Sequence, residues 1–266
     1  MQNKVLSFFG RRRNWTIPYA LFLAFFVLIP MALIVYYAFT NTDGEFTFAN
    51  IHKFWVHPEA MNTFIYSVVV ALITTTLCIL IGYPAAYILS KMEARKAKLL
   101  VILFILPMWI NFLIRTLATV ALFDFFKIPL GEGALIFGMV YNFLPFMIYP
   151  IYNILQKTDA NLIEAAQDLG ANPRQVFLKT ELPLSVPGIM SGIIMVFMPV
   201  ISTFAIAELL TINNIKLFGT TLQENIYNGT WNYGAALSLV MLLLIGLTAL
   251  MNRDGNSKAA EEGNLI

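Results

Sequence analysis

The sequence predicts an all-α protein that crosses a membrane six times. Apolar residues make up 59% of the chain and charged residues only 12%, against about 25% charged in an ordinary soluble domain. The 266 residues hold six apolar segments, each long enough to cross a bilayer as a helix. The net charge of +2 is too small to indicate a nucleic-acid partner. The single cysteine, Cys78, has no metal-ligand spacing around it.

The expected spans follow one another with short loops between them. The first follows Arg11 to Arg13, as a signal peptide would, but its apolar run of 25 residues is too long and lacks a small-x-small cleavage site. We therefore expect it to remain a span. Residues 1–14 are expected to lie on the inner membrane surface as an amphipathic segment, and the polar tail 252–266 to be mobile. The transmembrane domain is expected over 15–251, with spans at 15–39, 61–90, 99–122, 133–156, 187–211 and 233–251.

Basic residues are distributed unevenly between the two sides of the membrane. If the N-terminus is cytoplasmic, thirteen of the seventeen Lys and Arg residues fall on the inner side. Lys53, Lys127 and Lys216 fall outside, and Arg115 lies within the third span. Because loops rich in Lys and Arg stay in the cytoplasm, we expect both termini to be cytoplasmic.

The most informative stretch is a polar island between the fourth and fifth spans, Glu164 to Pro183. It is expected to form two short helices joined by a turn. Asp159 can cap the first helix, and Gly170 can adopt the left-handed conformation that ends it. Asn172 can cap the second helix, with Gln175 completing a capping box. The predicted orientation places this hairpin in the cytoplasm, within reach of a soluble partner. The alternative is a hairpin that merely links two spans.

The island also carries a family motif. Glu164-Ala165-Ala166, then Gly170 and later Leu182-Pro183, resembles the EAA loop of bacterial ABC importer permeases, and this loop (157–186) precedes the penultimate span, as it does in that family. The resemblance extends to the spermidine/putrescine permeases, B-type subunit. It is carried by IGYPAAY at 81–87, LPMWIN at 106–111, LIR at 113–115 and LPF at 144–146. One departure is that Thr211 and Ile212 follow Glu208-Leu209-Leu210 where the family usually has paired glycines, which puts the turn outside the fifth span in doubt.

This resemblance implies the fold of the type I importer permeases in a bacterial inner membrane. It also implies three partners besides lipid: a dimer of cytoplasmic ATPase subunits, a second homologous permease and an extracytoplasmic substrate-binding protein. Closure of the ATPase dimer on ATP would switch the pathway from inward-facing to outward-facing. The sequence has no GxxxxGK[ST] phosphate loop, so ATP is expected on the partner ATPase, and we expect no cofactor, metal or catalytic residue on this chain.

The same resemblance assigns roles within the EAA loop. Glu164 is implied to be the polar anchor of the ATPase contact, beside the thin face of Ala165 and Ala166. Gly170 is implied to let the second helix fold back, although a simple helix stop is the more common role of glycine. The coupling region is completed by Leu182 and Pro183.

Four residues are candidates for the substrate pathway: Trp109, Arg115, Asp124 and Glu208. A charge at mid-bilayer costs about 2.5–3.5 kcal/mol on insertion scales. On straight helices Arg115 and Glu208 would lie about 24 and 31 Å from the inner ends of their spans, in the outer half, with Asp124 just beyond. In the alternative reading Arg115 snorkels to the outer headgroups and Glu208 sits at the interface.

Trp109 lies about 15 Å into the third span by the same rise, away from the interfaces where tryptophan is usually found. Pro107 is predicted to kink the helix just before it. The indole could contact an alkyl-ammonium cargo through a cation–π interaction, or could pack against a neighbouring helix. Because an unpaired Arg115 would repel a cationic cargo, we expect it to pair with a carboxylate or to face away from the pathway.

Other function classes find less support. The two histidines, His52 and His57, lie in an outer loop without an HExxH motif, and the chain has no GxSxG motif, so we do not expect an enzyme. The alternatives are a permease for another small solute and an ATP-independent secondary transporter. A secondary transporter would be expected to show an internal repeat or broken helices in matched halves, neither of which we find in the sequence, and it would leave the EAA loop unexplained. Copurification of an ATPase would separate the two classes.

The charge distribution predicts the orientation directly. A reporter fused after Ile266 should read cytoplasmic, and one inserted near Asp43 should read external, because thirteen basic residues favour the inner side against three outside. Paired phosphatase and fluorescent-protein fusions measure this. An external C-terminus would rule out six spans with this orientation.

Overall fold

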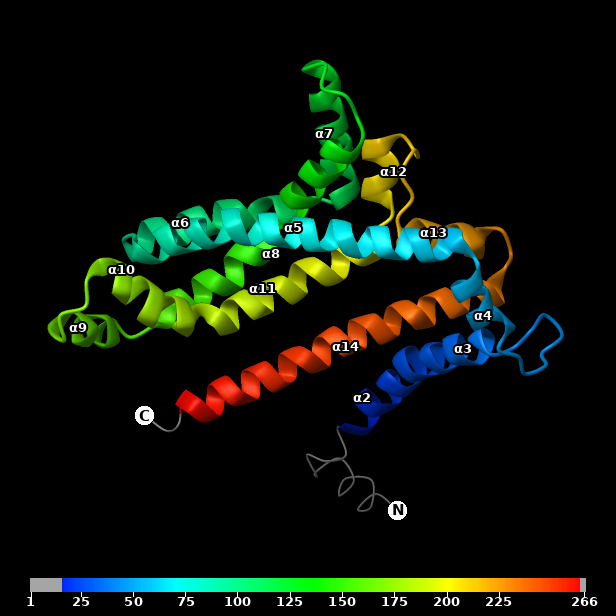
Figure 1. Cartoon of the computed structure of the whole chain (residues 1–266), viewed down its shortest axis with the longest axis horizontal. Helices are drawn as coiled ribbons and strands as arrows, with labels where there is room; N and C mark the ends of the chain where they lie inside the picture. The colour runs from blue at the N-terminus through cyan, green and yellow to red at the C-terminus, as the bar shows by residue number, and fades with distance from the viewer. Residues whose placement is uncertain (1–15, 264–266) are drawn as a thin grey trace, which may run out of the picture. The chain divides into compact units, whose positions relative to one another are not determined.

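The computed structural model describes the backbone over residues 16–263 and the side chains over 18–248. Within that range the chain is helical, and its only β pairing is an isolated bridge between Thr40 and Phe46. The chain divides into two compact units, one formed by 16–58 with 224–242 and the other by 59–223 with 243–263. The predicted surface segment 1–14 lies outside the described residues. Figure 1 labels the helices.

The first unit holds the beginning of the chain and the start of its last helix. Its elements are α2 (Thr16–Leu23), the π-turn η2 (Ala24–Leu28), α3 (Ile29–Ala38), α4 (Ala49–Val56) and the first turns of α14 (Trp231–Gly263). Asn232 at the start of α14 donates hydrogen bonds to the carbonyls of Tyr37 and Thr40, and the Lys53 ammonium lies 4.3 Å from the centre of the Tyr233 ring. These contacts hold the end of the first span against the start of the last.

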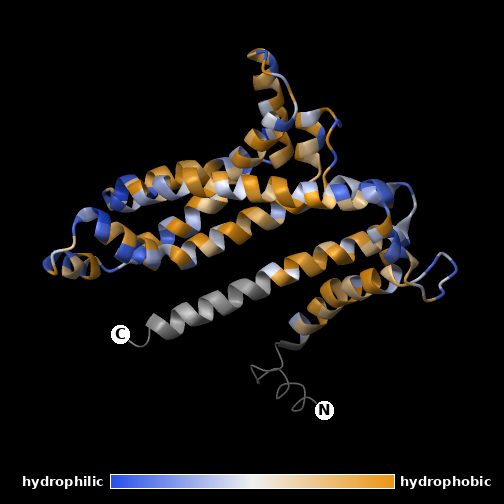
Figure 2. Ribbon diagram, in the orientation of Figure 1, coloured by the Kyte–Doolittle hydropathy of each residue, from blue (hydrophilic) through white to orange (hydrophobic). Residues whose placement is uncertain are grey.

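The second unit contains the remaining helices. They are α5 (Pro58–Lys91), α6 (Ala94–Ile105), the 3₁₀ turn η3 (Leu106–Trp109), α7 (Phe112–Phe125), α8 (Glu132–Lys157), α9 (Ala160–Asp168), α10 (Pro173–Val176), the π-turn η4 (Phe177–Glu181), α11 (Leu182–Ser202), α12 (Ala205–Thr211) and α13 (Phe218–Tyr227). Figure 2 shows that the long helices are apolar along most of their length, while polar residues gather around α9 and α10.

The core of this unit is the packing of α8 against α11, the most extensive contact between any two described helices. Glycine makes the close approach possible. A Cβ on Gly192 would lie 2.6 Å from the Met147 sulfur, and one on Gly188 would lie 3.0 Å from the Pro150 carbonyl oxygen. Small residues at helix crossings allow backbones to approach closely in membranes. Met147 and Ile151 are fully buried in this contact.

Among the described residues, five helical stretches are long and apolar enough to cross a membrane, and a bent helix pair makes a sixth if it is counted as one span. This confirms the predicted all-α architecture, with two corrections. The third predicted span, 99–122, is not one helix: it breaks after Trp109, and its halves meet at 95°. Pro107 lies in η3, two residues before that break, as expected for a residue without a backbone N–H. The fifth predicted span, 187–211, ends at Ser202, and Ala205–Thr211 form the separate helix α12.

Two further boundaries differ from expectation. The turn after α12 contains no glycine, yet Ile212 and Asn213 adopt the left-handed conformation, with φ of 52° and 58°. A β-branched residue is rarely found there, so the turn typical of paired glycines is retained under strain. The backbone of α14 continues as a helix to Gly263, well into the tail that was expected to begin at 252.

Candidate functional site

The hairpin between α8 and α11 forms as its side chains predict. The Asp159 carboxylate accepts a hydrogen bond from the Asn161 N–H at 3.0 Å and caps α9. Gly170 ends that helix with φ of 82°. Asn172 and Gln175 form the reciprocal capping box at the start of α10, with both hydrogen bonds at 2.9 Å. Because these contacts are local, they fix the angle between α9 and α10 without help from the spans.

The hairpin exposes both of the features that a docking surface needs. Glu164 and Ala165 are exposed on α9, and Ala166 is half-buried. Two large apolar residues that the sequence did not single out are also open to solvent, Leu162 and Leu169, the latter 89% exposed. Leu182 is half-buried and Pro183 exposed at the start of α11. Exposed leucines beside a carboxylate mark a surface for a partner protein.

A buried carboxylate joins the base of the hairpin to α5. Glu181 lies at the end of η4 with 3% of its surface exposed. It accepts a 2.7 Å hydrogen bond from the Tyr87 hydroxyl and a second, ionic one from the Lys91 ammonium. A buried carboxylate is stable only when partners replace its hydration. Sequence reasoning missed this residue, because an acid within the polar island 164–183 gave no sign that it would be buried.

Aromatic contacts strengthen the same joint. The Phe177 ring lies edge-on to Tyr83 and Tyr87, with ring centres 6.0 and 5.3 Å away. The Tyr83 hydroxyl lies 3.1 Å from the Ser185 hydroxyl. Phe177 to Glu181 form a π-turn, a local widening of the helix that often occurs at functional positions. The base of the hairpin therefore contacts the C-terminal part of α5 and continues into α11.

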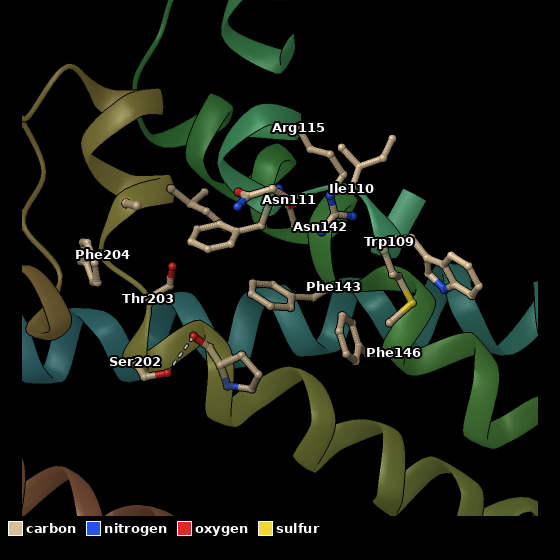
Figure 3. Close-up of a pocket in the computed structure, with 15 residues that line it drawn as sticks. Trp109, Ile110, Asn111, Arg115, Asn142, Phe143, Phe146, Ser202, Thr203 and Phe204 are labelled. Carbon is tan, nitrogen blue, oxygen red and sulfur yellow. Dashed lines mark hydrogen bonds between the residues drawn. The ribbon is translucent and has the colours of Figure 1, made fainter. Parts of the chain in front are cut away.

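The second feature is a cavity of about 510 Å³ beside the two helix breaks. Figure 3 shows its lining, in which Phe143 and Phe146 lie between Phe204 and Trp109 in this view. One wall is the break between η3 and α7, and another is the break between α11 and α12. Interrupted helices are tolerated in a membrane where they line a cavity. Their meeting here makes this the candidate site for a transported molecule.

The cavity contains buried polar atoms without partners. Arg115 on α7 is 8% exposed, and its Nε and Nη1 atoms make no hydrogen bond among the described residues. The Oδ1 atom of Asn142 on α8, also buried, has none either. Figure 3 shows the Arg115 side chain extending from α7 toward Asn142. The amide nitrogen of Asn142 donates to the Gly138 carbonyl at 2.8 Å, which leaves Oδ1 as the free acceptor.

The cavity lies partway along α8. α8 is a single helix of 26 residues, and Asn142 and Phe146 lie 10 and 14 residues after Glu132, about 15 and 21 Å from its N-terminal end. Arg115 lines the same cavity. The expected height of Arg115 assumed a straight third span, whereas the two halves of that span meet at 95°.

Two of the four candidate pathway residues meet at this cavity, and two do not. Trp109 and Arg115 line it, and Trp109 is 85% exposed. Asp124 is exposed at the far end of α7, where it lies 3.9 Å from Lys127. Glu208 is half-buried on α12, outside the cavity lining. The expected carboxylate partner of Arg115 is not found among the described residues.

Comparison with known proteins gives the following matches. Residues 78–253 match the family described as binding-protein-dependent transport system inner membrane component. The chain is 37% identical over 256 residues to the spermidine/putrescine transport system permease protein PotB of Haemophilus influenzae, with 86% of each chain covered. It is 32% identical over 253 residues to PotB of Escherichia coli K12, with 86% of this chain and 92% of that protein covered.

A solved structure shows the same fold. It belongs to a bacterial ABC transporter involved in the import of the acidic polysaccharide alginate. The TM-score is 0.65 at 16% identity, and the match covers 91% of this chain and 96% of that chain. At this identity the likeness concerns the fold alone.

The joint at Glu181 yields a prediction about stability. Lys91→Met should lower the free energy of unfolding in detergent by about 2 kcal/mol, because it leaves a buried carboxylate with one partner. The double variant Lys91→Met/Glu181→Leu should recover most of that loss. Thermal unfolding monitored by circular dichroism measures both. The control is Lys96→Met, whose exposed partner Glu93 lies 3.0 Å away, with an expected effect under about 0.5 kcal/mol. Strictly additive effects of Lys91→Met and Glu181→Leu would contradict the buried pair.

Proposed function

This chain belongs to the family of binding-protein-dependent transport system inner membrane components, and from that premise we propose that it imports a polyamine such as spermidine or putrescine. It is the permease subunit of an ABC importer, and it would form half of the translocation pathway. The observation that carries the cargo assignment is the 37% identity to a spermidine/putrescine permease over 86% of both chains. The aromatic lining of the cavity supports it, since aromatic faces can offset the lost hydration of ammonium groups.

The α9–α10 hairpin is the proposed docking site of a separate ATPase subunit. Glu164 provides the polar contact, the small side chains of Ala165 and Ala166 allow close approach, and Gly170 holds the turn. The exposed Leu162 and Leu169 would supply the apolar part of the contact. ATP-driven closure of two ATPase subunits would move the hairpin, and Glu181 would pass that movement to α5.

The remaining partners follow from the same assignment. A second permease subunit completes the pathway, and a binding protein delivers the cargo from outside. Both termini are proposed to be cytoplasmic, which places the hairpin on the side of the ATPase. The free energy of ATP binding then biases a pathway that has two stable arrangements.

Within the pathway, Trp109 is the proposed aromatic contact for the cargo. Its indole is 85% exposed at the cavity, where an alkyl-ammonium chain could lie against it. Glu208 and Asp124 remain candidates for the outer part of the route, away from the cavity, where a carboxylate could attract a cation before it enters.

The docking assignment can be tested on the hairpin. Gly170→Val should strain the turn, because valine rarely adopts φ near 82°. Glu164→Lys should weaken attachment of the ATPase. In the complete importer we expect transport to fall at least about tenfold for each while membrane insertion is unchanged. Uptake by membrane vesicles and copurification of the ATPase measure the two effects.

Gly133 offers a matched control for the glycine variant. It lies at the start of α8 with open space around its Cα, so Gly133→Val should leave transport within about twofold. Normal transport by both hairpin variants, with the ATPase fully bound, would reject the EAA assignment.

The cargo assignment can be tested at Trp109 and Glu208. Trp109→Ala removes the aromatic face, so uptake of radiolabelled spermidine should fall by about tenfold. Glu208→Gln keeps the shape but removes the charge, so uptake of a polycation should fall more than uptake of a neutral analogue. Unchanged spermidine uptake in both, with normal insertion, would make these residues structural.

A further inference from the structure

The guanidinium of Arg115 lacks a counter-charge, and the position of the cavity limits where one can come from. Among the described residues no acid lies at this cavity: Asp124 pairs with Lys127, and Glu208 lies on α12 outside the lining. Glu132, at the outer end of α8, accepts a hydrogen bond from Tyr66. A buried cation in a low-dielectric site is stable only when it is paired. The chain alone therefore leaves this site incomplete.

Three external sources of negative charge can be compared. A lipid phosphate is excluded by depth, since Asn142 and Phe146 beside Arg115 lie 10 to 14 residues into α8, close to mid-bilayer. The proposed cargo is a polycation and brings no negative charge. A carboxylate on a neighbouring membrane-spanning helix can reach this depth.

We propose that Arg115 is one half of an ion pair whose carboxylate belongs to a spanning helix of the second permease subunit. This rests on the proposed function in one respect, that a second permease is present. The open side of the cavity, bordered by Trp109 and Ile110, is then part of the interface between the two permeases. A guanidinium binds a carboxylate through charge-assisted hydrogen bonds. Nε and Nη1 of Arg115 are buried without a partner among the described residues, so the carboxylate is expected at Nη2, the nitrogen atom that is not closed off with them.

This pairing also resolves the conflict between Arg115 and a cationic cargo. A neutralised guanidinium no longer repels an ammonium group. The acceptor Oδ1 of Asn142 and the aromatic rings then face the cargo without an opposing charge. Arg115 acts here as a positioning residue for the permease pair. Only a neighbouring subunit that carries a carboxylate at the matching position can pair with it.

The test uses the complete importer with Arg115→Met, Arg115→Glu and Arg115→Lys. We expect Met and Glu to reduce both copurification of the second permease and cargo uptake at least about tenfold, and Lys to reduce them less. The matched control is Lys127, an exposed cation at the other end of α7, where Met and Glu should stay within twofold. In the Arg115→Glu background, each acid in the spans of the second permease is then changed to Arg. Recovery at one position identifies the partner carboxylate.

A second measurement leaves Arg115 intact in case its variants fail to insert. Ile110→Cys, in a chain with Cys78→Ala, is combined with single cysteines at the acidic positions of the second permease. We expect a disulfide cross-link at the acidic position of the second permease whose change to Arg restores the Arg115→Glu chain. If Arg115→Glu does not insert, we expect a cross-link at one acidic position in the spans of the second permease. Cross-linking at none of them overturns the proposal.

Other outcomes also decide against it. Normal copurification and uptake with Arg115→Met would overturn the ion pair. A mobile anion would be indicated instead by two results together. No acid-to-Arg change in the second permease restores an inserted Arg115→Glu chain, and uptake by the unmodified importer is lost when gluconate replaces chloride. Copurification and cross-linking do not depend on the cargo. If the unmodified importer takes up no spermidine, the polyamine assignment is rejected, but the proposed ion pair of Arg115 is not tested by that result.

Discussion

A helix in a bilayer must satisfy its own backbone hydrogen bonds, and this constraint determines where the chain can be interrupted. Two of its apolar segments are broken, after Trp109 and after Ser202. Both breaks lie at one cavity, which α8 crosses as a continuous helix. The freed backbone groups thus meet an open space instead of lipid. α8 also packs tightly on Gly188 and Gly192 of α11. The cavity and the closest helix contact therefore involve the same two helices.

The hairpin and the cavity are connected through α11. Its N-terminal end begins beside Glu181, which is bound to Tyr87 and Lys91 on α5. Its C-terminal end, at Ser202, forms one wall of the cavity. A movement of the hairpin could therefore reach the cavity along α11, while α5 constrains the base of that helix. Packed helices shift between discrete arrangements rather than bending continuously, and this favours a two-state pathway over a graded one.

The sequence was most informative where the determinants are local. The caps at Asp159 and Asn172 and the left-handed Gly170 depend on residues within four positions, and all three form as predicted. Pro107 likewise marked its break, but not the 95° turn that follows, because the direction of α7 depends on packing against α8. The end of α11 carries a similar marker, Pro199, three residues before Ser202, but the prediction carried the apolar run 187–211 through it as one span. The pairing of Glu181 with Lys91 spans 90 residues and has no local signature.

Glu181 and Arg115 show two ways in which a membrane protein accommodates a buried charge. Glu181 finds a hydroxyl and an ammonium within its own chain, so that joint is complete in the isolated subunit. Arg115 is buried, and two of its nitrogen atoms have no partner among the described residues. A guanidinium that stays without a counter-charge would be costly. If the counter-charge is supplied on assembly, the subunit depends on its correct neighbour. The Glu181 pairing is therefore made within the chain, whereas the proposed Arg115 pairing would need the assembled importer.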